Sequence, residues 1–117
     1  MGYKNIKSKE ERTEEGLKIR NKYPDRIPCI LEKLDENNNN SIPTIDKNKY
    51  LLPDNLVLSQ FLYVIRKRLK LSPDKALFVF CNGKILLNQS LMIDIYKQNK
   101  DEDHYLYLHY SGESTFG

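Results

Sequence analysis

The sequence predicts an α+β fold in which a four-stranded mixed sheet packs on one helix and follows an N-terminal helical extension. Three observations support this prediction. The chain has 117 residues, which is the usual size of one domain. Residues 56–70 carry large apolar side chains at helical spacing. Residues 76–81 form an unbroken apolar run, which is typical of a central strand buried on both faces.

The first expected element is a charged helix that begins at a capping box. Ser8 is followed three residues later by Glu11, the spacing at which side chains and backbone cap each other. We expect this helix to run to about Asn21, because the residue before Pro24 avoids the helical conformation. The expected organisation is an N-terminal helical extension over residues 1–24, a globular domain over residues 25–113 and a flexible tail over residues 114–117.

Two strands are expected next, over residues 27–33 and 49–52. In the first strand, Pro28 and Ile30 share one face because side chains alternate along a strand. The second strand runs directly into a proline, which favours a position at the edge of the sheet. A polar loop at 35–41 separates the two strands, and their closeness in the sequence predicts a hairpin.

The second half of the chain adds two helices and two strands. After the helix at 56–70 and the strand at 76–81, Asn82-Gly83 is a turn signal. Residues 91–96 have the spacing of a short helix, and residues 104–110 alternate between two faces as in a strand. Without the first helix the order is ββαβαβ, which resembles the ubiquitin-like β-grasp.

The charge is modest overall and unevenly distributed. The chain carries a net charge of +3. Residues 47–70 hold six basic and one acidic residue, a net of +5, while residues 91–117 hold two basic and five acidic residues, a net of −3. A basic face suits acidic peptides or anionic lipid headgroups, and the small excess argues against nucleic acid as a partner. Without an apolar leader or spanning segment, we expect a cytoplasmic protein.

The sequence offers no pattern that indicates catalysis. His104 and His109 are five residues apart on one predicted strand, so they point to opposite faces and cannot share a metal. Cys29 and Cys81 lie in apolar runs, which favours buried, reduced thiols. A glycine-rich phosphate loop is also absent from the sequence. We therefore expect no enzymatic activity, no cofactor and no metal.

Two acidic segments are interpreted as solvated. Residues 35–46 resemble the start of a calcium loop, but Asn40 replaces the glycine of the sharp turn and Asp46 replaces the bidentate glutamate. We therefore expect this loop not to bind calcium. The triplet Asp-Glu-Asp at 101–103 is interpreted as an exposed turn.

Five segments carry short motifs in a fixed order. They are KIRNKYPDRIP at 18–28, KNKYLLP at 47–53, QFLYVIRKR at 60–68, DKALF at 74–78, and EDHYLY with YSGESTFG at 102–107 and 110–117. The corresponding patterns KIRxKYPxRxP, DKKKYLVP, QFxxxIRKR, (D)ALF and EDxFLYxxYSxESxxG belong to the autophagy ubiquitin-like modifiers. The chain thus resembles this family, of the GABARAP and microtubule-associated light-chain type, from about Glu10 to Gly117.

The resemblance implies a modifier that is conjugated through its C-terminal glycine, here Gly117, to phosphatidylethanolamine. The implied partners are an activating enzyme, a conjugating enzyme, a ligase-like complex and a delipidating cysteine protease. The lipidated form is expected on autophagosomal membranes, where it acts in membrane growth and recruits cargo receptors. Because the chain ends at Gly117, either the gene encodes an exposed glycine or a precursor is processed.

The resemblance also implies two pockets for a receptor's aromatic-x-x-aliphatic motif with acidic flanks. The pocket for the aromatic residue maps to Glu15, Ile19, Pro28, Ile30, Lys49, Leu51 and Tyr105. The pocket for the aliphatic residue maps to Tyr50, Leu52, Pro53, Leu56, Phe61 and Val64. Contacts to the acidic flanks map to Arg26, Lys47, Lys49 and Arg68.

Three points stay open at the level of sequence. Tyr50 and Phe61 have a role in the core as their alternative interpretation. Tyr105 stands where phenylalanine is common in the family, so we expect a more polar rim at the first pocket. The alternative function is an unconjugated β-grasp adaptor in vesicle trafficking, which binds peptides and forms no adduct at Gly117.

Overall fold

The protein is described by a computed structural model that covers residues 2–34 and 42–113. The helices are α1 (Tyr3–Ile6), α2 (Lys9–Lys22), α3 (Leu58–Leu69) and α4 (Met92–Asn99). The strands are β1 (Arg26–Lys33), β2 (Lys49–Pro53), β3 (Phe78–Cys81), β4 (Lys84–Ile85) and β5 (Leu106–Ser111). The strands form one sheet in the order β2-β1-β5-β3-β4. Only β1 and β5 pair in parallel, so the sheet is mixed, as predicted.

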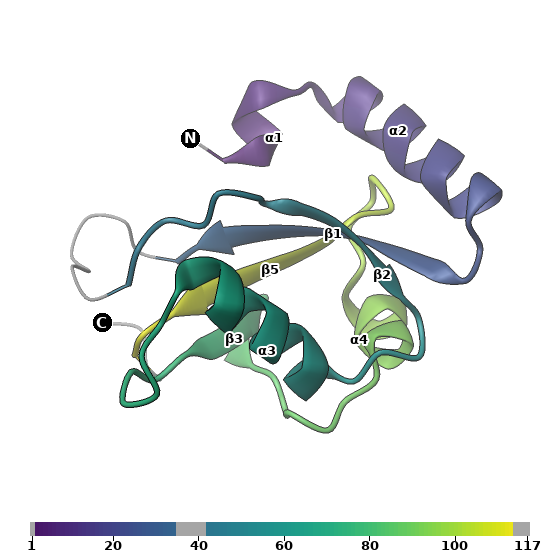
Figure 1. The fold of residues 1–117 in the computed structure, drawn as a ribbon. Coiled ribbons are helices and arrows are strands. Elements are labelled where there is room, and N and C mark those ends of the chain that lie inside the picture. The colour runs from purple at the N-terminus through teal and green to yellow at the C-terminus, as the bar shows by residue number, and fades with distance from the viewer. Residues whose placement is uncertain (1, 35–41, 114–117) are drawn as a thin grey trace.

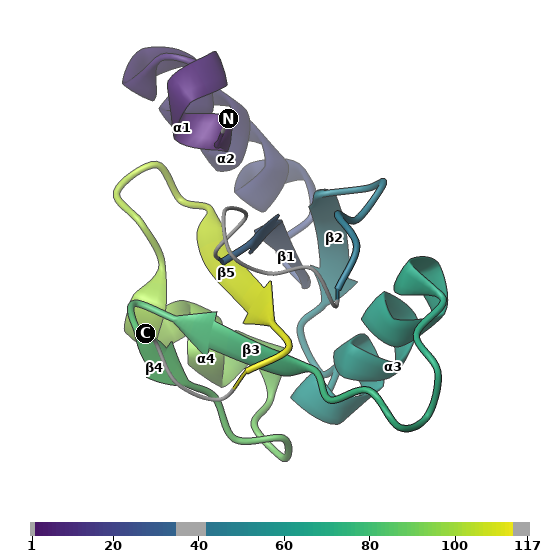
Figure 2. The same ribbon diagram turned by 90° about the vertical axis from the view of Figure 1, so that its left-hand side faces the viewer.

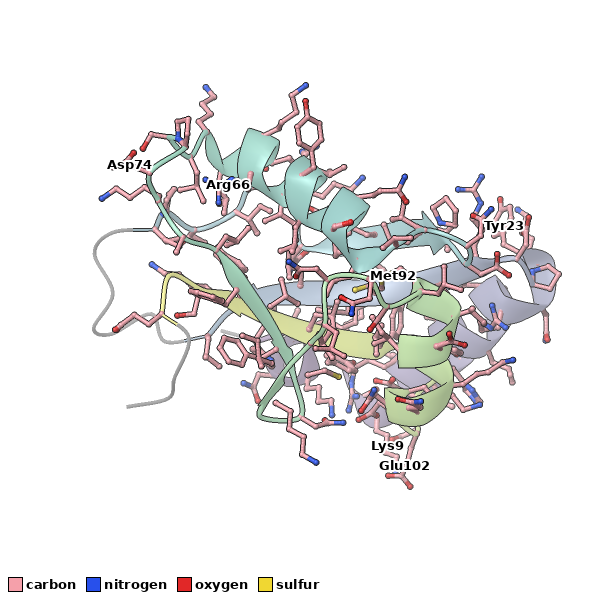
Figure 3. All side chains as sticks on the ribbon, turned by 90° about the horizontal axis from the view of Figure 1, so that it is seen from below. Lys9, Tyr23, Arg66, Asp74, Met92 and Glu102 are labelled. Atoms are coloured by element: carbon pink, nitrogen blue, oxygen red, sulfur yellow. The ribbon has the colours of Figure 1, made fainter. Side chains whose placement is uncertain are left out.

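Helices cover both faces of the sheet. Figures 1 and 2 show α1 and α2 on one face and α3 and α4 on the other. The main core lies beneath α3 and α4 and includes Phe61 and Met92, the latter labelled at the start of α4 in Figure 3. A second, smaller apolar cluster lies beneath α1 and α2 and consists of Tyr3, Ile30 and Tyr105. The chain therefore buries apolar side chains on both faces of the sheet.

Most of the predicted elements are present, with small shifts at their ends. The capping box at Ser8 and Glu11 starts α2 as predicted. β1 and β2 form the predicted antiparallel hairpin, and β2 lies at the edge of the sheet. The helix expected at 56–70 begins two residues later, at Leu58, and the helix expected at 91–96 continues to Asn99.

Two short elements were not predicted. The expected four-stranded sheet is wrong, because β4 adds a fifth strand at the edge. β4 has only two residues and both are exposed, so it leaves no alternating pattern in the sequence. The N-terminal extension also contains α1, whose four residues are too few for helical periodicity to appear.

The acidic triplet at 101–103 is only partly exposed, contrary to the prediction. Asp103 is fully buried, and its Oδ2 accepts a hydrogen bond from Nη1 of Arg12 at 2.6 Å. A carboxylate can be buried in this way when it is paired and hydrogen-bonded. Its partner lies 91 positions away in the chain, which is why local sequence gave no sign of it.

The register of β1 and β2 decides which backbone groups face the free edge. The N–H of Leu31 donates to the carbonyl of Asn48 at 2.7 Å, which makes these two residues a hydrogen-bonded pair. Bonded and non-bonded pairs alternate in an antiparallel ladder. Pro28, which has no N–H to donate, stands opposite Leu51 in a non-bonded pair. The backbone N–H and C=O groups of Lys49 and Leu51 therefore point away from β1.

Two sequence predictions fall outside the described residues, namely the polar loop at 35–41 and the tail at 114–117. Asp46, at the far end of the calcium-loop resemblance, is described and lies 3.2 Å from Nε of Arg68. Within residues 2–34 and 42–113, none of the helices combines the length and the hydropathy that crossing a lipid bilayer requires.

Candidate functional site

The residues implied for peptide binding lie on the two sides of β2. Lys49 bonds to Glu15 on α2, whereas the ring of Tyr50 contacts Phe61 on α3, as the alternation of side chains along a strand requires. The α2-side cluster consists of Glu15, Ile19, Pro28, Ile30, Lys49, Leu51 and Tyr105. The α3-side cluster consists of Tyr50, Leu52, Pro53, Leu56, Phe61 and Val64. The fold thus brings together residues that are up to 90 positions apart.

The floor of the α2-side cluster is apolar. Ile30 and Tyr105 are fully buried, and Ile19 packs against them. Pro28 is buried on β1 directly opposite Leu51 of β2. Leu51 is 38% exposed, so it presents apolar surface to solvent beside a buried apolar floor.

Glu15 organises the polar rim of this cluster. Its Oε1 accepts hydrogen bonds from Lys49 Nζ at 2.8 Å, from the Tyr105 hydroxyl at 2.5 Å and from the Tyr3 hydroxyl. Its Oε2 accepts from Lys7 Nζ at 2.6 Å. Lys49 Nζ also lies 5.2 Å from the ring centroid of Tyr3 and 5.7 Å from that of Tyr105. One carboxylate on α2 therefore binds side chains from the N-terminal segment, from β2 and from the residue directly before β5.

These contacts fix the charge states of the rim. Partial burial would raise the pKa of the Glu15 carboxyl, but the bonds from Lys49, Lys7 and both tyrosines outweigh burial and lower that pKa well below its ordinary value. Burial, together with the bond to the Glu15 carboxylate, raises the pKa of the Tyr105 hydroxyl. Glu15 is thus ionised and Tyr105 neutral at pH 7, and the hydroxyl of the buried Tyr105 is bonded to Glu15.

The α3-side cluster is continuous with the main core. Tyr50, Leu52 and Phe61 are buried, and the rings of Tyr50 and Phe61 meet edge to face with centroids 5.2 Å apart. Pro53 and Leu56 are half-buried, and Val64 is 42% exposed on the outer side of α3. Tyr50 and Phe61 therefore belong to the main core, and this side of β2 is a part of that core.

The cations expected to meet acidic flanks are exposed around both clusters. Arg68 pairs with Asp46 on the surface, and Lys47 Nζ lies 5.1 Å from the ring centroid of Tyr50. Arg26 is exposed at the start of β1. An exposed ion pair of this kind contributes little to the free energy of folding. An acidic ligand can therefore replace Asp46 as the partner of Arg68 with little loss of stability.

Tyr3 belongs to this site but was missed by sequence reasoning. Tyr3 is buried, and its ring meets that of Tyr105 edge to face, with centroids 5.7 Å apart. Its backbone N–H donates to Glu32 Oε2 at 2.6 Å, which holds α1 against the sheet. The family resemblance begins at about Glu10, so it assigned nothing to this residue. Gly117, the predicted conjugation residue, lies outside the described residues.

Comparisons with known proteins match nearly the whole chain. The family model described as "Autophagy protein Atg8 ubiquitin like" matches residues 11–117. The chain is 54% identical over 115 residues to autophagy-related protein 8 of Mycosarcoma maydis, a match that covers 98% of this chain and 95% of that protein. It is 55% identical over 108 residues to autophagy-related protein 8A of Oryza sativa subsp. indica, which covers 92% and 88% of the two chains.

Solved structures give the same result for the fold. The crystal structure of Trypanosoma brucei ATG8 matches with a TM-score of 0.87 and 43% identity over 100% of this chain and 98% of that one. Plasmodium falciparum Atg8, solved in complex with a Plasmodium falciparum Atg3 peptide, matches with a TM-score of 0.88 and 33% identity over 99% of both chains. The predicted ubiquitin-like α+β fold is therefore confirmed.

Atg8 proteins are autophagy modifiers and not enzymes; they are conjugated to phosphatidylethanolamine and bind short peptide motifs. The identity to a curated Atg8 protein exceeds one half, and the structural match to an Atg8 crystal structure covers the full length of this chain. The chain belongs to the Atg8 family of autophagy ubiquitin-like proteins.

Proposed function

We propose that this modifier is joined to phosphatidylethanolamine through Gly117 and recruits cargo receptors along the edge of β2. ATP adenylates the Gly117 carboxylate with release of pyrophosphate, and a thiol of the activating enzyme displaces AMP to form a thioester. The glycyl group passes to a thiol of the conjugating enzyme, which frees the first thiol, and the lipid amine then displaces the second thiol to form the amide. A residue without a Cβ suits this chemistry because it leaves the attacking groups room. The two acyl chains, at about 0.8 kcal/mol per buried CH2, then anchor the protein stably.

The peptide-binding half of the proposal is carried by one observation, the exposed edge of β2 between the two clusters. The N–H and C=O groups of Lys49 and Leu51 point outward there, and an extended peptide can pair with them as an added strand. Side chains alternate along such a peptide. Its aromatic residue would enter the α2-side cluster and its aliphatic residue the α3-side cluster, with Arg26, Lys47 and Arg68 near its acidic flanks.

The partners follow from the two halves of the proposal. Gly117 is the substrate of the activating enzyme, the conjugating enzyme and the delipidating cysteine protease. Receptors with acidic-flanked aromatic-x-x-aliphatic motifs bind at β2, and the Plasmodium falciparum Atg8 structure contains a peptide of an Atg3 protein. The unlipidated protein is then cytoplasmic, and the lipidated protein resides on autophagosomal membranes.

Membrane flotation tests the conjugation. Wild type and Gly117→Ala are incubated with the activating and conjugating enzymes, ATP and vesicles that contain phosphatidylethanolamine. We expect wild type to gain a lipid adduct and float, and Gly117→Ala to do neither. Gly112→Ala, a glycine change five positions upstream, is the matched control and should behave as wild type. A Gly117→Ala protein that acquires lipid and floats would overturn the proposal and favour the unconjugated adaptor.

A further inference from the structure

We propose that Asp103 is a positioning residue for recognition of the motif's aromatic side chain, although it lies outside the α2-side cluster. The inference rests on the proposed function, because it assumes that this cluster receives the aromatic residue.

The carboxylate of Asp103 is fully buried and uses both oxygens. Its Oδ1 accepts the backbone N–H of Tyr105 at 2.9 Å. Its Oδ2 accepts Nη1 of Arg12 at 2.6 Å and the hydroxyl of Tyr107 at 2.5 Å. The side chain of Arg12 is itself only 9% exposed. Charge-assisted bonds in a buried setting are strong and geometrically specific, so this carboxylate has one defined arrangement.

These bonds reach both the floor and the rim of the α2-side cluster. Tyr105, whose backbone N–H is bound by Asp103, lies in the apolar floor directly before β5. Arg12, whose guanidinium is bound by Asp103, lies on α2 one helical turn before Glu15, which organises the polar rim. Residues three apart on a helix lie on the same face, so a shift of Arg12 also moves Glu15. The 2.5 Å bond between the Tyr105 hydroxyl and Glu15 Oε1 then closes a ring of contacts around the cluster.

Gly16 allows α2 to approach this loop closely. A Cβ at Gly16 would lie 2.2 Å from the carbonyl oxygen of Asp103, which is too close for a side chain without a shift of the helix. Outside this contact, the same helix and loop are joined by an exposed ion pair between Lys9 and Glu102 at 3.4 Å, and the two side chains lie side by side in Figure 3. The buried pair of Arg12 and Asp103 can therefore be compared with the exposed pair of Lys9 and Glu102, which joins the same two elements.

The α3-side cluster is independent of Asp103. Its members come from β2, α3 and the segment between them, and Tyr50 and Phe61 belong to the main core. The side-chain hydrogen bonds of Asp103 go to Arg12 on α2, to Tyr105 and to Tyr107, and its backbone N–H donates to Asp101 in the same loop. Loss of the Asp103 carboxylate should therefore impair recognition of the aromatic residue and spare recognition of the aliphatic residue. A general loss of stability would impair both.

A peptide-by-protein cycle measures this difference. The peptides are an acidic-flanked aromatic-x-x-aliphatic sequence and two versions in which the aromatic or the aliphatic residue is alanine, and calorimetry gives each Kd. In wild type, each alanine should cost about ten- to a hundredfold in affinity. For the Asp103→Asn protein, replacing the peptide's aromatic residue by alanine should reduce the affinity by less than about threefold. Replacing the peptide's aliphatic residue by alanine should reduce it as much as in wild type.

Further variants keep the test decisive. Gly16→Ala, which displaces α2 by steric contact, should likewise reduce the effect of the aromatic-to-alanine change on affinity and leave the effect of the aliphatic-to-alanine change as in wild type. Lys9→Ala, which breaks only the exposed pair, should leave both effects as in wild type. Tyr107→Phe removes one donor and keeps the ring, so it should show a smaller loss of the same kind even if Asp103→Asn does not fold. Thermal unfolding of each variant confirms that the folded protein is measured.

The outcomes separate this inference from the proposed function. If wild type shows no cost for the aromatic-to-alanine change, the α2-side cluster is not the aromatic pocket and the proposed function fails at that point. If the aromatic-to-alanine change weakens binding to wild type and weakens binding to folded Asp103→Asn and Tyr107→Phe by the same factor, the pocket assignment holds. The role of Asp103 is then overturned. The role of Asp103 would also be overturned if, in Asp103→Asn, both alanine peptides lost the same share of their wild-type affinity difference from the parent peptide.

Discussion

The two clusters beside β2 are built by different means. The α3-side cluster is an extension of the main hydrophobic core, where Tyr50, Leu52 and Phe61 are buried among apolar neighbours. The α2-side cluster rests on a small second core and is shaped by a carboxylate, Glu15, that receives four donors. One surface is therefore held by apolar burial, which is non-directional, and the other by directional, charge-assisted bonds.

This difference teaches how one edge strand can serve two purposes. A surface that belongs to the core keeps its shape as long as the protein is folded, and little in its environment changes it. A surface held by ionised groups responds to pH, to salt and to the removal of a single donor. In the proposed complex, the surface that binds the aliphatic residue should therefore be insensitive to pH and salt. The surface that binds the aromatic residue should be sensitive to both.

The largest expected effect is on stability, from Phe61→Ala. Phe61 is fully buried, and truncation of a buried phenylalanine typically costs about 3–5 kcal/mol in the free energy of unfolding. Denaturant unfolding measures the loss, and binding of the motif peptide should weaken as well. A folded Phe61→Ala protein that retains wild-type stability would show that the α3-side cluster is separate from the core.

Leu51→Ala should act on binding far more than on stability. Leu51 is 38% exposed, so its truncation should change the unfolding free energy by less than about 1 kcal/mol. Its contact with a ligand's aromatic residue should be worth about tenfold or more in affinity. Titration calorimetry beside denaturant unfolding checks both numbers. Unchanged affinity in the folded variant would contradict the placement of the aromatic residue.

The stabilising contribution of Glu15 should depend on pH. Its pKa in the folded state is below the ordinary value of 4.5, so the unfolded chain binds more protons at acidic pH. Stability from this group is therefore fully present above pH 4.5 and is lost as the pH falls toward the lower, folded-state value. The difference in unfolding free energy between wild type and Glu15→Gln should shrink on acidification below pH 4.5. A difference that stays constant down to pH 3 would show that the charge of Glu15 contributes nothing.

The smallest expected effect is the salt dependence of Lys49→Ala. Lys49 is partly exposed and bonds to Glu15, and in the proposed complex it faces the acidic flank of the ligand. Its removal should weaken peptide binding by a few-fold at low salt, and the effect should decrease near 1 M salt, where the screening length is about 3 Å. Leu51→Ala is the control, because an apolar contact should keep its effect as salt rises.

The sequence predicted the main elements because their signals are local. The spacing in α3, the capping box at Ser8 and the proline that ends the edge strand β2 all act within a few residues, and each predicted element is present. The elements that were missed, α1 with four residues and β4 with two, are too short for a periodic pattern to repeat. Long-range pairing left no local signal either, as the exposed turn wrongly predicted at Asp103 shows.

For the candidate site, the family resemblance supplied the residues and the fold supplied their arrangement. Neither the closeness of Lys49 and Glu15 nor the role of Tyr3 follows from local patterns, since these side chains meet only when α1, α2 and β2 are in place. The hydroxyl of Tyr105 was singled out by comparison with the family, where phenylalanine is common at this position, and in the fold it donates to Glu15.

The central claim is that a motif peptide pairs with the free edge of β2, and amide hydrogen exchange tests it most directly. The N–H groups of Lys49 and Leu51 point away from β1, whereas those of Tyr50 and Leu52 bond to it. Exchange is followed by NMR with and without a saturating aromatic-x-x-aliphatic peptide. We expect new protection at Lys49 and Leu51 when the peptide is bound, with Tyr50 and Leu52 protected in both states. Peptide binding that leaves the exchange of Lys49 and Leu51 unchanged would contradict it.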